Sequence, residues 1–227
     1  MTATASSSPK LRVDTRGTNE LPPHLDENLL TPRFYVTEFK KAAKTELTDA
    51  REEFEAMLSE MKADYNCTHF DRKASLDRLQ ELPQKAKETY ESYLVRSVIS
   101  EFSGFLLFKE ISNRLKKEGN RDLGKLFQFL ARDEARHAGF LSRALVAEGI
   151  EVDLPHLGGK RAATWFPISW VIYSVYLSEK IGYWRYILMD RHLKANPGEA
   201  FAPLFDFFEP WCQDENRHGD CFTVMMR

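Results

Sequence analysis

Residues 133–137 read Asp-Glu-Ala-Arg-His, and residues 214–218 read Asp-Glu-Asn-Arg-His. Each string contains Glu-x-x-His, a spacing that puts both side chains on one face of a helix, one turn apart. Average composition gives a single Asp-Glu-x-Arg-His in about one chain in a thousand of this length. Two copies, far apart in the chain, therefore indicate that one functional motif is repeated.

The acidic and imidazole side chains of these strings fall on faces that should be buried. Each Glu-x-x-His continues an apolar stripe at spacings of three and four residues: Leu123, Leu126, Leu130, Glu134, His137, Leu141, Leu145 in one helix and Phe205, Phe208, Trp211, Glu215, His218, Phe222, Met225 in the other. A buried, unpaired carboxylate costs several kcal/mol or takes up a proton, and a bound cation removes that difficulty. A solvated face, or an internal ion pair such as Glu134 with Arg217, is the alternative that the large apolar neighbours disfavour.

Four long helical patterns surround these stripes, over about residues 85–117, 122–148, 168–194 and from 200 to the end. Short links near Gly119 and Pro197 join antiparallel neighbours, whereas the link over 149–167 is long. We therefore predict an all-α, ferritin-like four-helix bundle of two helical hairpins joined by a long crossover. A further N-terminal helix is expected over 48–64. The expected division is a flexible arm over 1–30 and the ferritin-like di-iron domain over 31–227.

A di-iron site in such a bundle needs one more carboxylate from each of the other two helices. Glu101 and Glu179 interrupt the apolar stripes of the first and third patterns. They lie 33 and 36 residues before Glu134 and Glu215, and this similar spacing lets two antiparallel hairpins bring their acids to one level. Glu110 is the rival in the first pattern, but its charged neighbours favour the surface. The predicted metal ligands are Glu101, Glu134, His137, Glu179, Glu215 and His218.

Carboxylates with imidazole suit iron or manganese, whereas structural zinc favours thiolates. We expect Glu134 and Glu215 to bridge two metal ions and the remaining two glutamates to bind one ion each. No catalytic residue beyond the metal ligands is predicted.

The residues next to the ligands have a predicted supporting role. Asp133 is expected to accept the free imidazole N–H of His218, and Asp214 that of His137. Arg136 and Arg217 either neutralise these two acids or are ordinary surface arginines. The sequence alone leaves that choice open.

Composition narrows the class of protein. The 227 residues suit one large domain, and the net charge of −2 excludes a general basic surface for nucleic acid. The three cysteines include no Cys-x-x-Cys pair, which excludes a rubredoxin-like or zinc-ribbon module. No run of eighteen apolar residues is present, so no single helix is expected to span a bilayer.

Five longer motifs carry a family resemblance: LLTPRFY (29–35), EFSGFLLFKE (101–110), DEARH (133–137), LSEKIGYWRY (177–186) and WCQDENRHGD (211–220). Together they resemble the aerobic magnesium-protoporphyrin IX monomethyl ester cyclases, the di-iron enzymes of chlorophyll and bacteriochlorophyll synthesis. The likeness begins near Leu29. It implies the same six metal ligands and an oxidation that turns the methyl-propionate side chain of a magnesium porphyrin into the isocyclic ring of divinyl protochlorophyllide.

The resemblance also implies cofactors and partners. Two iron ions, dioxygen and an external reductant are expected, because the sequence has no GxGxxG fingerprint or cysteine cluster for an electron carrier of its own. Ferredoxin with NADPH is the implied donor, and a small accessory scaffold protein is an implied partner. The implied location is the cytoplasmic side of photosynthetic membranes, bound peripherally, or a plastid. Family members continue in helical sequence beyond the second motif, so a truncated C-terminus is expected.

Three further features have two interpretations each. The aromatic segment over 165–173 would line a porphyrin pocket or lie at a membrane interface, although we favour the buried start of a core helix. Cys212 faces an oxygen pocket or is a small buried hydrophobe. Tyr176 and Tyr183 flank Glu179 at helical spacing, and packing is favoured over a radical role.

Other functions remain open at this level. A different di-iron oxygenase or a ferroxidase would use the same ligands, and a non-enzymatic helical module would need the metal only for stability. Iron content and substrate-dependent oxygen uptake separate these hypotheses.

Overall fold

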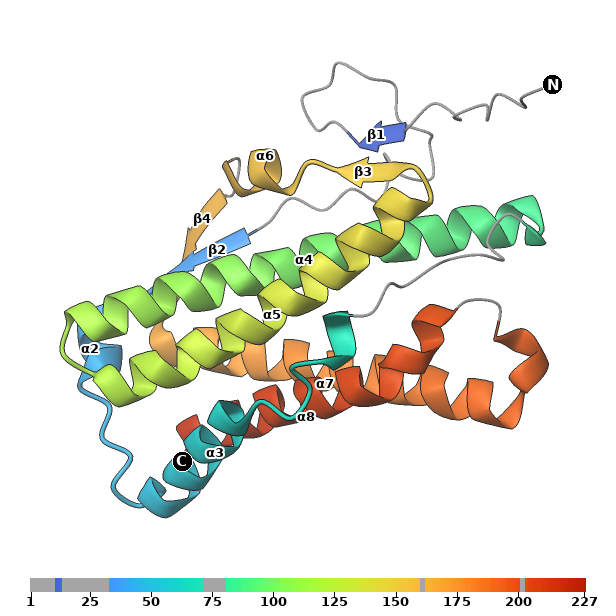
Figure 1. Cartoon of the computed structure of the whole chain (residues 1–227). Helices are drawn as coiled ribbons and strands as arrows, with labels where there is room; N and C mark the ends of the chain where they lie inside the picture. Colours follow the sequence, from blue (N-terminus) through green and yellow to red (C-terminus); the bar gives the residue numbers. More distant parts are fainter. Residues whose placement is uncertain (1–10, 14–32, 72–80, 160–161, 201–202) are drawn as a thin grey trace.

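A computed structural model describes residues 11–13, 33–71, 81–159, 162–200 and 203–227. Two helical hairpins make up most of it (Figure 1). The first joins α4 (Gln84–Lys117) to α5 (Arg121–Ala147), and the second joins α7 (Ile168–Ala195) to α8 (Phe208–Met225). The prediction of an all-α four-helix bundle with a long crossover is confirmed.

The ends of the long helices follow local sequence. Gly119 and Gly149 have φ angles of 100° and 82°, which glycine adopts without steric cost just after a helix. The side chain of Asn120 accepts a hydrogen bond of 3.1 Å from the Leu123 amide and so caps α5. The last helix begins at Phe208, later than predicted, because Pro203–Phe207 forms a separate 3-10 helix. Pro210 lies in the first turn of α8, where its missing N–H is not needed.

Segments outside the bundle pack along its surface. The predicted extra N-terminal helix is α3 (Arg51–Ala63), preceded by the short α2 (Phe39–Ala43) and followed by a 3-10 helix (His69–Asp71). A further 3-10 helix (Pro197–Glu199) lies in the link between α7 and α8. The α3 helix packs against α5 and α8, and its C-terminal end lies near the middle of α5 (Figure 1).

The crossover between the hairpins contains short strands that the sequence analysis did not predict. β1 (Leu11–Val13) pairs in parallel with β3 (Ile150–Val152), and β2 (Arg33–Val36) pairs in parallel with β4 (Ala162–Trp165), with the short helix α6 (Leu154–Gly159) between β3 and β4. Strands of three and four residues are too short to give a period-2 pattern. The predicted arm over 1–30 stays a prediction, since residues 1–10 and 14–32 lie outside the described residues.

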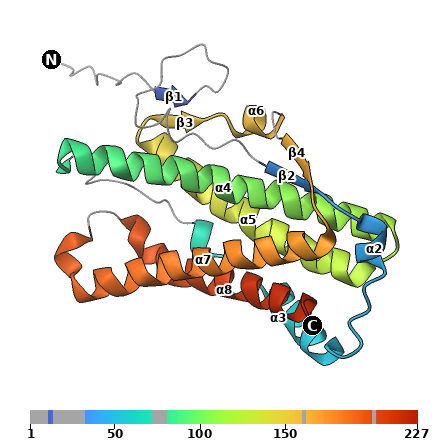
Figure 2. The same cartoon turned by 180° about the vertical axis from the view of Figure 1, so that it is seen from behind.

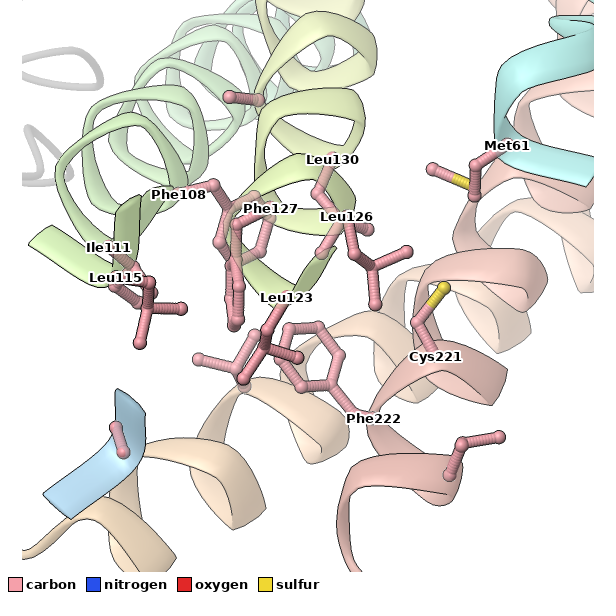
Figure 3. Close-up of a cluster of buried hydrophobic side chains, with 14 of the residues drawn as sticks. Met61, Phe108, Ile111, Leu115, Leu123, Leu126, Phe127, Leu130, Cys221 and Phe222 are labelled. Carbon is pink, nitrogen blue, oxygen red and sulfur yellow. The ribbon is translucent and has the colours of Figure 1, made fainter. Parts of the chain in front are cut away.

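The apolar core consists of two clusters. One packs the N-terminal half of α4 against the C-terminal half of α5 and the start of α8. The other packs the opposite ends of these helices, where Phe108, Phe127 and Phe222 point toward one another with ring centroids about 6 Å apart (Figure 3). The level between the clusters, near Glu101 of α4 and Glu134 of α5, is therefore buried on both sides.

Candidate metal centre

Six acidic and imidazole side chains occupy the level between the two apolar clusters. Each of the four long helices contributes: α4 one glutamate, α7 one glutamate, and α5 and α8 a glutamate and a histidine each. All six side chains are buried, and both imidazoles have no exposed surface. They are the six predicted ligands, Glu101, Glu134, His137, Glu179, Glu215 and His218.

These side chains form two groups that have the spacing of metal ligands. One ligand atom from each of Glu101, Glu134, His137 and Glu215 lies within 4.8 Å of the others. The same holds for a second group, made of Glu134, Glu179 and His218. Because Glu134 belongs to both groups, the geometry suits two neighbouring cations that share a carboxylate.

The two histidines have the same orientation. Nδ1 of His137 lies 3.2 Å from Glu101 Oε2, and Nδ1 of His218 lies 3.2 Å from Glu134 Oε1 and 3.1 Å from Glu179 Oε2. The other ring nitrogen of each histidine points away from the glutamates. A metal held among these carboxylates would therefore meet Nδ1 of both imidazoles.

The outward nitrogens meet the aspartates of the opposite hairpin. Nε2 of His137 forms a hydrogen bond of 3.1 Å with Asp214 Oδ2, whereas Nε2 of His218 lies 3.5 Å from Asp133 Oδ2, an ion-pair distance without hydrogen-bond geometry. An acceptor in this position fixes the ring orientation and the tautomer of a ligating histidine. The crossed contacts also tie α5 to α8 at the level of the site.

Cations surround both aspartates. Arg136 lies 3.4 Å from Asp133 and also pairs with Asp64, at 2.9 Å, while Arg217 contacts Asp214. These two arginines are only partly exposed, so an ordinary surface role does not describe them.

Sequence patterns did not indicate three further residues of this network, two that contact the aspartates and one that pairs with Arg136. Arg132 pairs with Asp133 at 2.8 Å, Asn66 donates to Asp214 Oδ1 at 2.9 Å, and Asp64 holds Arg136. Asp64 and Asn66 follow α3 and are 70 residues or more from their partners, so no local pattern points to them. The charge of Arg132 next to the motif was the one available signal.

The charges within the centre are unfavourable without a cation. Burial and the charges of Glu101 and Glu179 raise the pKa of Glu134 to about 8, and burial with the same neighbours raises the pKa of Glu215 well above its usual value. Burial lowers the pKa of His137, but hydrogen bonds to Asp214 and Glu101 outweigh it and raise this pKa well above normal. These carboxylates and imidazoles retain protons in the absence of metal. A divalent metal would replace those protons, so the raised pKa values fit a metal site.

A cleft of about 220 Å³, lined mainly by residues of α4 and α7, leads from the surface to the glutamates. Figure 2 views the bundle from the side of these two helices. Gly104 of α4 and Gly182 of α7 face Glu134 and Glu215 at the floor of the cleft. Serines from both helices and Arg185 line the cleft further out, namely Ser100, Ser103, Ser174 and Ser178. The carboxylates are therefore buried by the bundle and yet reachable from one side.

A sequence model of the rubrerythrin family matches residues 92–226, which contain all six side chains of the centre. The chain belongs to the rubrerythrin family. The buried carboxylate–histidine centre of this rubrerythrin-family chain supports iron binding. No solved structure matches the chain.

The chain is also similar to curated proteins over most or all of its length. It is 73% identical over 227 residues to a Prochlorococcus marinus (strain MIT 9313) protein named magnesium-protoporphyrin IX monomethyl ester [oxidative] cyclase. It is 54% identical over 201 residues to a cyclase 2 of the same name from Thermosynechococcus vestitus, and 48% identical over 202 residues to one from Cyanidioschyzon merolae. These alignments cover 100%, 88% and 88% of the chain, and 64%, 56% and 60% of the relatives. The resemblance inferred from the motifs is confirmed, and the chain spans about 64% of the length of its first-named relative.

The remaining sequence candidates lie outside the centre. Glu110 pairs with Arg114 at 2.7 Å on the outer side of α4. Cys212 is buried in an apolar cluster and donates to the Glu209 carbonyl, and burial raises its thiol pKa to about 11, as befits a small hydrophobe. Tyr176 and Tyr183 are half-buried and pack against the two apolar clusters, on the sides of α7 next to the stripe that holds Glu179.

The aromatic segment at the start of α7 is mostly exposed, so the favoured interpretation of a buried helix start was wrong. Trp170 is 62% exposed, and Ile181, three turns further on, is 66% exposed. The outer face of α7 carries the apolar side chains Trp170, Tyr173, Leu177, Ile181, Trp184 and Leu188. Since α7 is apolar on two sides, hydrophobicity alone could not tell its buried face from its outer one. No helix in the described part of the chain is long and apolar enough to cross a membrane.

Gly104→Ala and Gly182→Ala are expected to weaken metal binding without unfolding the protein. A Cβ at either position would lie inside van der Waals distance of the Glu134 or Glu215 carboxylate. The side-chain end can move aside, but a displaced carboxylate no longer has the ligand geometry. We expect an iron affinity about 10-fold lower, by analogy with the loss of supporting contacts around ligands, measured by competition with a chelator.

Gly139→Ala is the matched control for these variants, because its Cβ would meet only an arginine side chain at 3.6 Å. It lies on α5, close to His137 along the chain but on the outer face. Equal iron affinity in all three variants would contradict the proposed close fit between the glycines and the carboxylates.

Proposed function

We propose that this chain provides the di-iron site of an oxygen-dependent cyclase that converts magnesium-protoporphyrin IX monomethyl ester to divinyl protochlorophyllide, which closes the isocyclic ring in chlorophyll synthesis. The observation that carries the proposal is a buried centre of four glutamates and two histidines that a cleft reaches from one side. Relatives up to 74% identical bear the name of this cyclase, which supports the choice of substrate.

The proposed ligand roles follow from the two groups. Glu101 and His137 would hold one iron ion, and Glu179 and His218 the other. The carboxylates of Glu134 and Glu215 would bridge them, which suits the membership of Glu134 in both groups. When bound, the two iron ions supply the electrons that begin the reduction of dioxygen. The protein keeps both imidazoles in place through the crossed aspartates described above.

The size of the cleft indicates how the substrate would enter. At about 220 Å³ it is smaller than the roughly 300–1,000 Å³ of sites that enclose a whole drug-sized ligand. It suits the methyl-propionate side chain, with the macrocycle lying over the mouth. Gly104 and Gly182 leave the bridging carboxylates accessible at the floor, and Ile99, Leu107 and Val175 provide apolar walls that help to exclude water.

The proposal includes partners and a location. Electrons would come from ferredoxin with NADPH, and a small accessory scaffold protein would assist in some lineages. Peripheral binding to photosynthetic membranes, on the cytoplasmic side in a bacterium or within a plastid, would bring the protein to its product's site of use.

The test is anaerobic loading of the chain with ferrous iron, followed by magnesium-protoporphyrin IX monomethyl ester, reduced ferredoxin and air. We expect oxygen uptake that depends on the porphyrin and a product with the mass and absorption of divinyl protochlorophyllide. Glu110→Ala, a surface change on α4, is expected to behave like the unchanged chain.

Two results would contradict the cyclase. Iron-loaded chain that neither binds the ester nor consumes oxygen in its presence would exclude this substrate. Rapid oxidation of added ferrous iron with no dependence on the porphyrin would favour a ferroxidase, the competing hypothesis for the same ligands. Iron that stabilises the fold without any oxygen consumption would favour a structural metal.

A further inference from the structure

Two oxidisable aromatic side chains contact the proposed ligands on one side of the centre. Trp211 Nε1 donates a hydrogen bond of 3.0 Å to Glu215 Oε1, and the Tyr186 hydroxyl donates one of 3.2 Å to Glu101 Oε1. The two rings are stacked, with centroids 4.6 Å apart and an interplanar angle of 28°. Trp211 also lies over the His137 ring, at 4.8 Å.

Trp211 and Tyr186 begin a row of π systems that continues outward from Tyr186 through Arg185, Tyr93 and Tyr90. The Arg185 guanidinium lies 4.6 Å from the centroid of the Tyr186 ring and 5.9 Å from that of Tyr93. It donates a hydrogen bond of 3.0 Å to the Tyr186 hydroxyl, so this oxygen accepts from Arg185 while it donates to Glu101. Tyr93 stacks in turn on Tyr90, with centroids 6.0 Å apart. An almost continuous series of π systems thus leads away from the centre along α4.

Packing alone does not account for this pair, because the other hairpin fills the equivalent positions differently. Trp211 precedes Glu215 by four residues, as Leu130 precedes Glu134. Tyr186 follows Glu179 by seven residues, as Phe108 follows Glu101. Leu130 and Phe108 are buried and cannot be oxidised at moderate potential, yet they serve the core on their side. Apolar residues could therefore fill the space that Trp211 and Tyr186 occupy. These two side chains differ from such residues in that they form hydrogen bonds to the ligands and can be oxidised.

We propose that Tyr186 and Trp211 each donate one electron to the di-iron centre when dioxygen is reduced with no porphyrin bound. The proposal rests on the proposed oxygen chemistry of the site. Reduction of dioxygen to two water molecules takes four electrons and four protons. Two electrons come from the two ferrous ions as they become ferric, and the organic substrate supplies the other two during productive turnover.

In the absence of substrate, the pair supplies the missing two electrons. Tyr186 loses an electron and its phenolic proton, which passes along the existing hydrogen bond to Glu101, and a neutral tyrosyl radical remains. Trp211 loses an electron and its indole proton, which passes to Glu215. Glu101 and Glu215 release these two protons to the oxygen that is being reduced, and solvent in the cleft supplies the other two protons. The external electron donor later returns one electron, and solvent one proton, to each ring. The consequence is a site that survives uncoupled reaction with oxygen without oxidising its own ligands.

The test uses the full chain loaded anaerobically with ferrous iron, mixed with air-saturated buffer without porphyrin and frozen for electron paramagnetic resonance. We expect an organic radical signal with tyrosyl and tryptophanyl components, which ring-deuterated tyrosine and tryptophan would identify. Tyr186→Phe should remove the tyrosyl component, and Trp211→Phe the tryptophanyl one. Tyr183→Phe, on the same helix but outside the row, should leave both unchanged.

Iron content by metal analysis accompanies each sample and keeps the two proposals apart. A variant with normal iron content but no radical supports the inference, and Phe108 shows that a phenylalanine is accepted at the position equivalent to Tyr186. Iron-loaded, unchanged chain without any radical overturns it, as does a radical that persists in the double variant. A radical in a chain that makes no divinyl protochlorophyllide would support the redox pair and contradict the cyclase.

Discussion

Glu134→Ala is expected to abolish iron loading in a protein that remains helical. Glu134 is the one carboxylate that belongs to both ligand groups, so its loss disrupts the binding of both metal ions rather than one. The two apolar clusters on either side of the centre do not depend on it, and they hold the four helices together. The measurement is iron per chain after anaerobic loading and desalting, with far-ultraviolet circular dichroism to follow helix content. Glu215→Ala should give the same result, because Glu215 is the second proposed bridging carboxylate.

Glu110→Ala is the control for this experiment. It removes a carboxylate from α4 that pairs with Arg114 on the surface, and it should leave iron content unchanged. Iron content equal to that of the unchanged chain in Glu134→Ala would refute the bridging role.

The metal-free protein is expected to lose stability as pH rises. Glu134, with a pKa raised from 4.5 to about 8, favours folding most when protonated, so its contribution is lost between these values. For Glu134 alone the loss is on the order of 5 kcal/mol at one pKa unit per 1.36 kcal/mol. Glu215 acts in the same direction, and so do His137 and His218, whose raised pKa values mean that protonated rings stabilise the fold. We expect the Tm in the presence of a chelator to fall by about 10 °C or more between roughly pH 5.5 and pH 8.5.

Two comparisons sharpen this prediction. Glu134→Gln, which carries no titratable proton, should show a smaller fall in Tm over the same range. Iron-loaded protein should not show the fall, because the metal replaces the protons. Asp133 and Asp214 have lowered pKa values, since the neighbouring histidines and arginines outweigh burial, so their contribution is lost only in acid. A metal-free Tm that rises toward pH 8.5 would contradict the prediction.

The helices and the buried glutamates could be predicted from sequence because both depend on the spacing of residues within a single helix. The long helices have apolar stripes, and the glutamates stand out because they interrupt those stripes at matched positions in both hairpins. A charged residue inside an apolar pattern is informative, since burial of a charge is costly unless something compensates it. For this reason the spacing of residues along the chain is enough to select Glu101 and Glu179 and to favour Glu101 over its rival Glu110.

The features that escaped prediction depend on contacts distant in sequence. Asn66 reaches Asp214 from the turn after α3, and nothing near either residue signals the partner. Tyr186 lies on the apolar stripe around Glu179, which indicates core packing, so a radical role was considered only for Tyr176 and Tyr183, which lie to either side of that stripe. The prediction that the start of α7 is buried was wrong for a different reason. In the sequence, an apolar residue on the outer face of a helix cannot be distinguished from one that faces the core.

The division of the bundle into two hairpins has a consequence for how the protein folds. Each hairpin is made of contacts between chain neighbours joined by a short link, and such local contacts form quickly. The six ligands, by contrast, come together only when one finished hairpin docks on the other. We therefore expect repulsion among the glutamates to arise at this late step and to slow docking. Metal ions present during synthesis would speed the last step of folding, so iron supply would govern the yield of folded protein as well as its activity.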